Sequence, residues 1–280
     1  MATEAQLLGG NDIRELAARL DVVPTKKLGQ NFVTDPNTIR RIVAAAKLTG
    51  TETVVEIGPG LGSLTLGLIE VANKVISVEI DPKMAAAIEA TVALRAPGAD
   101  FTLVSADAMK VTDLGAAPDA LVANLPYNIS VPVLLHFLEQ FPSLQTGLVL
   151  VQAEVAHRLA ANPGSKVYGV PSVKLAWYAE RALAGNVGRT IFWPVPNVDS
   201  ALVYFAKRDQ PLGDEALRLV VFEAVDAAFS QRRKTLRQAL AGWAGSPAEA
   251  ERILIAAGIE PQKRGEQLTV HDFVKIAQAK

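Results

Sequence analysis

Short apolar runs alternate with longer amphipathic stretches between residues 53 and 152. The apolar runs are rich in β-branched residues and predict strands at 53–57, 74–80, 101–105, 121–123 and 147–152. Amphipathic stretches at 83–94 and 133–141 predict helices between strands. This α/β alternation is typical of a parallel, doubly wound sheet. Two further runs, 173–179 and 201–205, predict an antiparallel pair that closes the sheet.

The pattern differs on both sides of this region. An amphipathic helix is predicted at 11–20, a polar and basic segment follows at 24–32, and another helix is expected to start near Asp35 and Pro36. After Pro211 the sequence predicts only short helices, at 214–230, 232–243, 247–257 and 269–279. We therefore predict an N-terminal extension (1–23), an α/β domain (24–210) and a helical domain (211–280).

Composition narrows the classes of function. The chain has 280 residues, half of them hydrophobic, and no cysteine, which excludes disulfides and thiolate metal sites. Three scattered histidines, His136, His157 and His271, lack ligand spacing and predict no metal site. No apolar run approaches the ~18–20 residues of a membrane helix and no signal peptide is visible, so we expect a cytoplasmic protein without a membrane partner. A net charge of −1 confines any nucleic-acid surface to a local basic patch.

Successive strand ends carry residues suited to a nucleoside. Gly58 and Gly60 follow the first strand, where glycines let the backbone approach a ligand closely. Glu79 ends the second strand, where a carboxylate can accept hydrogen bonds from ribose hydroxyls, and Asp107 follows the third. Ser63 replaces the third glycine of a dinucleotide fingerprint, so that match is imperfect. Each carboxylate alone would suit a helix cap, but the ordered set predicts a nucleoside cofactor.

The segment after the fourth strand favours S-adenosylmethionine over NAD(H) as that cofactor. By itself, Asn124-Leu125-Pro126-Tyr127 is equally well explained as a packed turn. No histidine lies at a strand end to assist hydride transfer, whereas methylation of an amino group depends mainly on positioning. The Asn124 amide and a carbonyl of Leu125 or Pro126 can accept hydrogen bonds from adenine N6, while Tyr127 stacks on the base.

Motifs in this order resemble those of the small-subunit ribosomal RNA adenine N6,N6-dimethyltransferases. They are Gly29-Gln30-Asn31-Phe32, Glu56-Ile57-Gly58-Pro59-Gly60, Glu79-Ile80-Asp81, Ala106-Asp107-Ala108, Asn124-Leu125-Pro126-Tyr127-Asn128-Ile129-Ser130, Phe192-x-Pro194-x-Pro196-x-Val198-Asp199-Ser200, Phe229-Ser230-Gln231-Arg232-Arg233-Lys234-Thr235-Leu236 and Glu266-Gln267-Leu268-Thr269. The resemblance runs from about residue 24 to the C-terminus.

The resemblance implies a seven-stranded, mostly parallel, Rossmann-like methyltransferase sheet with a small C-terminal all-helical domain. It implies dimethylation of two adjacent adenosines in a 3′-terminal hairpin of small-subunit rRNA, within the pre-30S particle. The cofactor residues carried over are Asn31, Val33, Gly58, Gly60, Glu79, Asp107 and Asn124, and the target base would lie between Tyr127 and Phe192. Val33, Asn197 and Gln238 depart from the usual Leu, Lys and Asn of the family, and none of the three touches the expected chemistry.

A concentration of basic residues is expected to contact the RNA. Arg232, Arg233, Lys234 and Arg237 predict one basic helix face. Lys26 and Lys27, together with Arg40 and Arg41, are expected to form a second patch. Such a run is more often a solvated face, but an rRNA substrate needs a phosphate-binding surface. A macrolide-resistance-type large-subunit rRNA methyltransferase and a non-catalytic ribosome-assembly or transcription factor remain the alternatives. We expect a monomer.

Overall fold

The computed structural model describes residues 4–21 and 31–280. The chain divides into two compact units, one formed by residues 1–156 and 182–206 and the other by residues 157–181 and 207–280. The sequence placed the start of a helical domain at residue 211. The second unit also contains residues 157–181, because the side chains of that segment share an apolar core with the C-terminal helices.

The first unit is built on a seven-stranded sheet in the order β4-β3-β2-β5-β6-β9-β7. Strands β2 to β6 run parallel to one another, and β9 is antiparallel to β6. The strands are β2 (Thr53–Ile57), β3 (Lys74–Glu79), β4 (Phe101–Ser105), β5 (Ala120–Asn124), β6 (Thr146–Gln152), β7 (Ala179–Val187) and β9 (Ser200–Lys207). The predicted α/β fold with a mostly parallel sheet of seven strands is confirmed.

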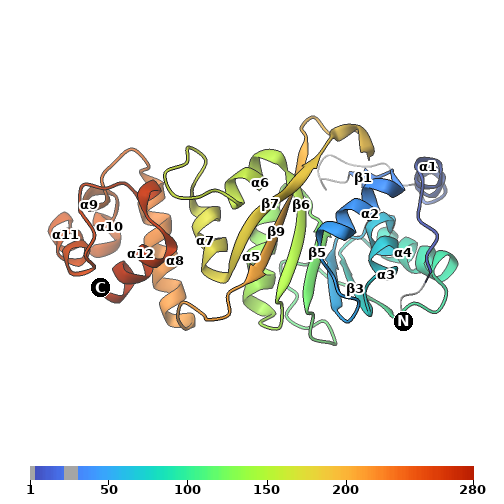
Figure 1. Ribbon diagram of the computed structural model, residues 1–280, viewed down its shortest axis with the longest axis horizontal. Helices are drawn as coiled ribbons and strands as arrows, with labels where there is room; N and C mark the ends of the chain where they lie inside the picture. The colour runs from blue at the N-terminus through green and yellow to red at the C-terminus, as the bar shows by residue number, and fades with distance from the viewer. Residues whose placement is uncertain (1–3, 22–30) are drawn as a thin grey trace. The chain divides into compact units, whose positions relative to one another are not determined.

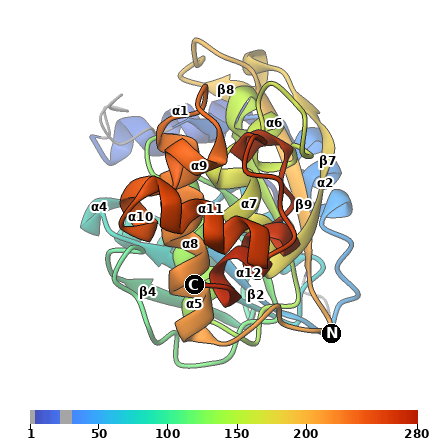
Figure 2. The same cartoon turned by 90° about the vertical axis from the view of Figure 1, so that its left-hand side faces the viewer.

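Helices cover both faces of this sheet (Figures 1 and 2). One apolar core joins the helices on the first face to alternate strand residues such as Val54, Val75 and Val122. These helices are α1 (Gly10–Arg19), α2 (Pro36–Ala45), α3 (Ser63–Ile69) and α4 (Pro82–Arg95). Helix α5 (Ser130–Gln140) lies on the opposite face, and α6 (Ala153–Leu159) follows β6. Asp35 caps α2 by accepting a hydrogen bond from the Thr38 backbone N–H, as the Asp35-Pro36 start suggests.

A two-stranded antiparallel sheet was not anticipated from the sequence. It pairs β1 (Phe32–Val33) with β8 (Phe192–Trp193), so that Phe32 lies opposite Trp193 and Val33 opposite Phe192. The rings of Phe32 and Trp193 stack with their centroids 6.3 Å apart. A short 3₁₀ turn (Arg189–Ile191) precedes β8. This pairing holds the segment that precedes α2 beside the segment that precedes β9.

The predicted strand at 173–179 is wrong. Those residues belong mostly to α7 (Val170–Tyr178), and the strand β7 begins only at Ala179. A short apolar run does not distinguish a strand from a buried helix by periodicity alone. Val173, Ala176 and Trp177 share one helical face and are buried in the core of the second unit, which decides for the helix.

The second unit contains the helices predicted after residue 211, with one correction. They are α8 (Glu215–Ser230), α9 (Leu236–Ala239), α10 (Ala241–Ala244), α11 (Pro247–Ala256) and α12 (Val270–Gln278), with a 3₁₀ turn at Gly265–Gln267. The expected helix at 232–243 is interrupted, because residues 231–235 form a turn and α9 starts only at Leu236. The capping box of Thr269 and Asp272 is present, with a 2.8 Å hydrogen bond from the Thr269 hydroxyl to the Asp272 carboxylate.

None of the helices in the described ranges is both long and apolar enough to cross a bilayer.

Candidate active site

A cavity of about 240 Å³ lies at the carboxyl ends of β2, β3, β4 and β5. In a doubly wound sheet this edge is where ligands bind. Each of the four strands contributes at least one predicted site residue to the cavity wall. The predicted residues that line it are Asn31, Val33, Gly58, Gly60, Glu79, Asp107, Asn124 and Pro126. The tertiary structure therefore brings together side chains that the sequence separates by up to 95 residues.

The glycine turn after β2 forms one wall. Gly58 and Gly60 have positive φ angles of 68° and 55°, which side chains other than glycine rarely adopt. A Cβ atom at Gly60 would lie 2.7 Å from the ring of Phe32, so the ring and the turn are in close contact. Phe32 also lines the cavity, in agreement with the interpretation of its segment as a flap that contributes Asn31 and Phe32 to a site, and the β1–β8 pairing holds it there.

Two buried carboxylates lie at the base of the cavity. The Oε1 atom of Glu79 accepts a hydrogen bond from the Asp81 backbone N–H at 2.9 Å, and burial raises the pKa of Glu79. Glu56 is 1% exposed and accepts hydrogen bonds from the hydroxyls of Thr65 at 2.6 Å and Ser77 at 2.9 Å. Burial raises the pKa of Glu56 to about 7. From the sequence, Glu56 was recognised only as part of a motif, and its position in the cavity wall was not predicted.

The charged groups of the cavity all have the same sign. Its described wall contains the carboxyl groups of Glu56, Glu79, Asp81 and Asp107 and no Lys, Arg or His side chain. These four groups do not form a metal site, because no cluster of three or more metal-ligating side chains occurs within 4–21 and 31–280. An acidic wall with two desolvated carboxyl groups favours a cationic ligand and disfavours one that carries phosphates.

The hydroxyl of Ser63 in the cavity wall lacks a hydrogen-bond partner among the described residues. Ser63 is 7% exposed, and its Oγ atom is buried without a hydrogen bond in the described part of the chain. Leaving a buried hydroxyl unpaired costs about 1–3 kcal/mol. A ligand with polar atoms in this cavity would remove that cost, which is a feature of a binding site more than of a closed core.

The amide of Asn124 has a defined orientation at the end of β5. Its Nδ2 atom donates a hydrogen bond to the Asn31 backbone carbonyl at 2.9 Å, which leaves the amide oxygen as the acceptor. The backbone N–H of Leu125 donates to the Leu150 carbonyl at 3.1 Å, so the chain after Asn124 is tied to β6. The Pro126 carbonyl accepts from the Ile129 N–H at 3.2 Å and closes a turn. The segment therefore presents an acceptor from a rigid backbone.

Three of the predicted residues do not line the cavity. Leu125 is buried, and Tyr127 is half-buried with its hydroxyl 2.7 Å from the Ser200 hydroxyl. Burial raises the pKa of Tyr127, so its hydroxyl stays protonated in this hydrogen bond. Phe192 is 2% exposed and belongs to the apolar core through β8. The rings of Tyr127 and Phe192 are therefore held in place, but neither of them lines the cavity.

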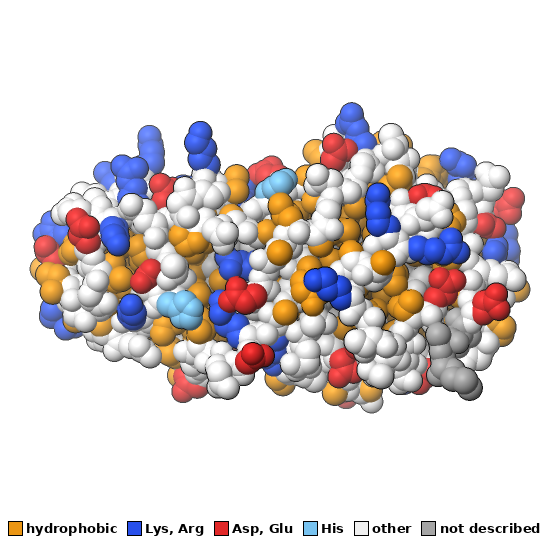
Figure 3. All heavy atoms as spheres, viewed as in Figure 1, with side chains coloured by type: hydrophobic (Ala, Val, Ile, Leu, Met, Phe, Trp, Pro, Cys, Tyr) orange, Lys and Arg blue, Asp and Glu red, His pale blue; other side chains and the backbone are white. Residues whose placement is uncertain are grey.

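The predicted basic residues of the second unit differ in their surroundings. Arg232 forms a 3.0 Å ion pair with Glu266, and Arg237 a 2.8 Å ion pair with Glu251. Arg233 and Lys234 are exposed in the turn after α8, so the predicted basic helix face is a turn instead. Figure 3 shows Lys and Arg side chains projecting over the C-terminal helices on the visible face. The predicted contacts Lys26 and Lys27 lie outside the described residues.

A family model described as ribosomal RNA adenine dimethylase matches residues 24–280. The chain belongs to the ribosomal RNA adenine dimethylase family. It is 62% identical over 281 residues to ribosomal RNA small subunit methyltransferase A of Streptomyces coelicolor, with 99% of this chain and 98% of the relative covered.

Solved structures agree with the fold of an adenine dimethylase. A dimethyladenosine transferase from Plasmodium falciparum superposes with a TM-score of 0.74 at 24% identity, covering 88% of this chain and 95% of that one. The 23S rRNA methyltransferase ErmE gives a TM-score of 0.66 at 26% identity, covering 89% and 99%. Both likenesses extend over most of the adenine dimethylase chain described here and support one shared architecture.

We predict that Glu56→Gln flattens the pH dependence of stability. The pKa of Glu56 rises from the ordinary 4.5 to about 7 on folding, so the folded chain holds a proton that the unfolded chain releases. The proton on Glu56 adds about 3 kcal/mol to the free energy of unfolding. This contribution is complete below about pH 4.5 and is lost as the pH rises to about 7.

The measurement is urea unfolding of both proteins between pH 4.5 and 8. Gln keeps one oxygen to accept from Thr65 and Ser77, so the variant serves as a near-isosteric comparison. An unchanged slope in the variant would show that Glu56 is not the titrating group.

Proposed function

We propose that this chain transfers methyl groups from S-adenosylmethionine to N6 of two adjacent adenosines in a 3′-terminal hairpin of small-subunit (16S) rRNA. The observation that carries the proposal is an acidic cavity, free of Lys, Arg and His in its described wall, with the Asn124 amide at its edge. Membership of the adenine dimethylase family and the name of the Streptomyces coelicolor relative support adenine and the small subunit as the targets.

The residues of the cavity fit S-adenosylmethionine. This cofactor supplies a methyl group on a positively charged sulfur, and its amino-acid end carries further polar atoms. Glu79 would accept from the ribose hydroxyls, and Asp107 or its neighbouring backbone would bind the adenine amino group. The glycine turn, Asn31 and Val33 would hold the remainder through their backbones, and the unpaired Ser63 hydroxyl suits a polar ligand. NAD(H) fits less well, because its two phosphates would face four carboxyl groups.

The residues at the end of β5 would prepare the adenine for transfer. The amide oxygen of Asn124 and the Leu125 carbonyl would accept hydrogen bonds from the N6 amino group. These bonds draw the nitrogen lone pair out of conjugation with the ring and direct it, and they stabilise the positive charge that N6 develops. Asn31 holds the Asn124 amide in the required orientation through its carbonyl. Positioning and electrostatics then supply the catalysis, without a strong base.

Tyr127 would provide a face for the target base, and its hydroxyl bond to Ser200 keeps the ring in place. Stacking on an aromatic ring contributes about 1–3 kcal/mol per base. Phe192 is proposed as the second ring, as the resemblance implies. Because Phe192 is buried between β1 and the core, a base stacked on it would have to displace neighbouring side chains.

The helical unit is proposed to bind the rRNA, with Arg233 and Lys234 as phosphate contacts. We also propose that the substrate is the pre-30S particle and that the enzyme acts as a monomer. The large-subunit alternative is disfavoured, because identity to ErmE is 26% against 62% to the small-subunit relative. A purely binding role is disfavoured by the ordered acceptor at Asn124, which a ribosome-assembly factor would not require.

The decisive experiment is transfer of tritiated methyl groups into unmethylated small subunits, followed by nucleoside analysis. We expect label in N6,N6-dimethyladenosine of small-subunit RNA. Label only in large-subunit RNA would support the resistance-type enzyme. Tight binding of subunits without any label would support the assembly factor.

Asn124→Ala is expected to lower the methylation rate about 100-fold or more, since it removes a positioned acceptor that acts in the transition state. S-adenosylmethionine affinity should fall much less, because other wall residues hold the cofactor. Single-turnover kinetics and calorimetry of cofactor binding separate the two effects. A rate within a few-fold of the wild type would remove Asn124 from the proposed contact with N6.

A variant with Arg233→Glu and Lys234→Glu is expected to weaken binding to small subunits and to leave cofactor affinity unchanged. Both side chains are exposed, so their replacement should not disturb the core. Binding is measured by filter retention and cofactor affinity by calorimetry. Equal loss of both affinities would indicate misfolding, and unchanged subunit binding would exclude these two residues from the interface.

A further inference from the structure

Three segments of the second unit hold a large share of the chain's positive charge. Residues 163–168, 231–237 and 261–267 together contain seven of the 28 Lys and Arg residues and a single acidic residue, Glu266. The chain as a whole has a net charge of −1, so this concentration is local. The segments are far apart in the sequence, and only the middle one was predicted from the sequence to form a basic patch.

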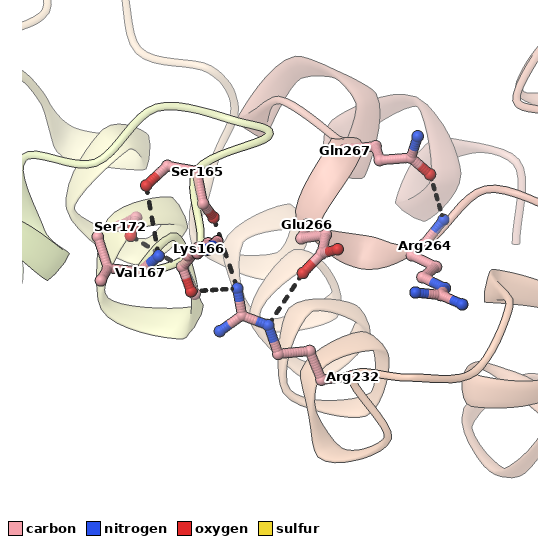
Figure 4. Close-up of polar contacts among 9 residues, drawn as sticks. Ser165, Lys166, Val167, Ser172, Arg232, Arg264, Glu266 and Gln267 are labelled. Atoms are coloured by element: carbon pink, nitrogen blue, oxygen red, sulfur yellow. Dashed lines mark hydrogen bonds and ion pairs between the residues drawn. The ribbon is translucent and has the colours of Figure 1, made fainter.

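Arg232 joins the three segments through its guanidinium group (Figure 4). Its Nε atom donates to the Glu266 carboxylate at 3.0 Å. One terminal nitrogen donates to the Lys166 backbone carbonyl at 2.6 Å and lies 3.5 Å from the Ser165 carbonyl. A planar guanidinium with fixed donor directions suits such a junction, whereas an ammonium group cannot reproduce it.

Backbone hydrogen bonds reinforce this junction. The Gly164 N–H donates to the Glu266 carbonyl at 2.7 Å, and the Leu236 N–H donates to the Lys263 carbonyl at 2.7 Å. Main-chain hydrogen bonds therefore tie the 261–267 segment to each of the other two, and the Arg232 side chain connects those two to each other. Arg232 is only 40% exposed in its side chain, and two of its nitrogens already have protein acceptors.

The remaining cations on these segments are available to a partner. Lys166, Arg233, Lys234, Lys263 and Arg264 are exposed, and their side chains form no ion pair with another described residue. The Lys166 carbonyl accepts a hydrogen bond from Arg232, so the 163–168 segment is attached to the turn that also carries Arg233 and Lys234. We call these exposed cations of the three connected segments the three-loop surface.

We propose that Arg232 is a positioning residue that fixes the 163–168 segment, and that Lys166 thereby joins Arg233 and Lys234 in contacting the phosphate backbone of the RNA. This inference rests on the proposed function, since it takes rRNA as the partner. It differs from the prediction from sequence in two ways: Arg232 acts through its neighbours instead of contacting phosphate, and a lysine outside the basic motif becomes a phosphate contact.

The first experiment measures affinity for unmethylated small subunits as a function of potassium chloride concentration at fixed magnesium. We expect Lys166→Ala to weaken binding by about three- to tenfold and to reduce the slope of log affinity against log salt by about one. Lys275→Ala is the matched control, because Lys275 is an exposed lysine of the same unit that belongs to α12 and to none of the three segments. An effect of Lys166→Ala no larger than that of the control would overturn the role of Lys166.

The second experiment compares Arg232→Lys with Arg232→Gln. If Arg232 positions the loop, the two variants weaken subunit binding to a similar degree, because neither can bridge Glu266 and the two carbonyls. If Arg232 contacts phosphate directly, Arg232→Lys retains most of the wild-type affinity, and the positioning role is refuted.

A double-mutant cycle then tests the connection between the two residues. We expect Lys166→Ala to cost less in the Arg232→Gln background than in the wild type, because the lysine is no longer held in place. Additive effects would refute the positioning role. S-adenosylmethionine affinity and thermal unfolding must remain at wild-type values, which excludes misfolding as the cause.

These outcomes are separate from those of the proposed function. Failure of the wild-type chain to bind small subunits would contradict the proposed function itself. Normal binding and methylation by the wild type, with an unchanged salt slope in Lys166→Ala, would contradict only the three-loop surface.

Discussion

The parallel register of β2 with its neighbours is the constraint on which the site depends. Ile57 at the end of β2 lies opposite Val78, the residue before Glu79, and Glu79 lies opposite Ser105, two residues before Asp107. On the other side β5 pairs with both β2 and β6, which fixes Asn124 opposite Leu150. A shift of one residue in any pairing would turn the site residue to the other face of the sheet. Parallel pairing therefore converts four strand ends into one ligand site.

The cavity retains electrostatic strain that its ligand would relieve. Glu56 is buried beneath the wall with a raised pKa, and Glu79 is desolvated close by. Two such groups without a cation in the described wall are costly unless a ligand compensates them. A ligand that carries a positive charge lowers that cost, whereas the neutral thioether left after methyl loss does not. In the proposed function, the same arrangement would bind the sulfonium cofactor and assist release of the product.

Some arginine residues of the second unit make contacts within the protein, whereas others are exposed and unpaired in the described structure. Arg232 and Arg237 each form an ion pair with a glutamate, while Arg233 and Lys234 stand free of such pairs in the described structure. An exposed ion pair by itself contributes little stability. Arg232 differs because it also bonds to the main chain of a segment 66 residues away, which gives it a structural role within a basic motif.

The sequence by itself determined the order of the elements and the chemistry at their ends. Hydrophobic periodicity located β2 to β6. The residue types at Gly58, Glu79, Asp107 and Asn124 indicated an adenosine cofactor and an adenine substrate. Both predictions were possible because strand positions and site chemistry depend on local pattern and on side-chain chemistry.

The tertiary structure alone decided the features that depend on long-range packing. It made 170–178 a helix because its apolar face is buried with the C-terminal helices. It paired β1 with β8, which brought the Phe32 ring to the cavity and buried Phe192, and it joined Lys166 to Arg232. No local signal encodes such contacts, since they exist only once distant segments share a core.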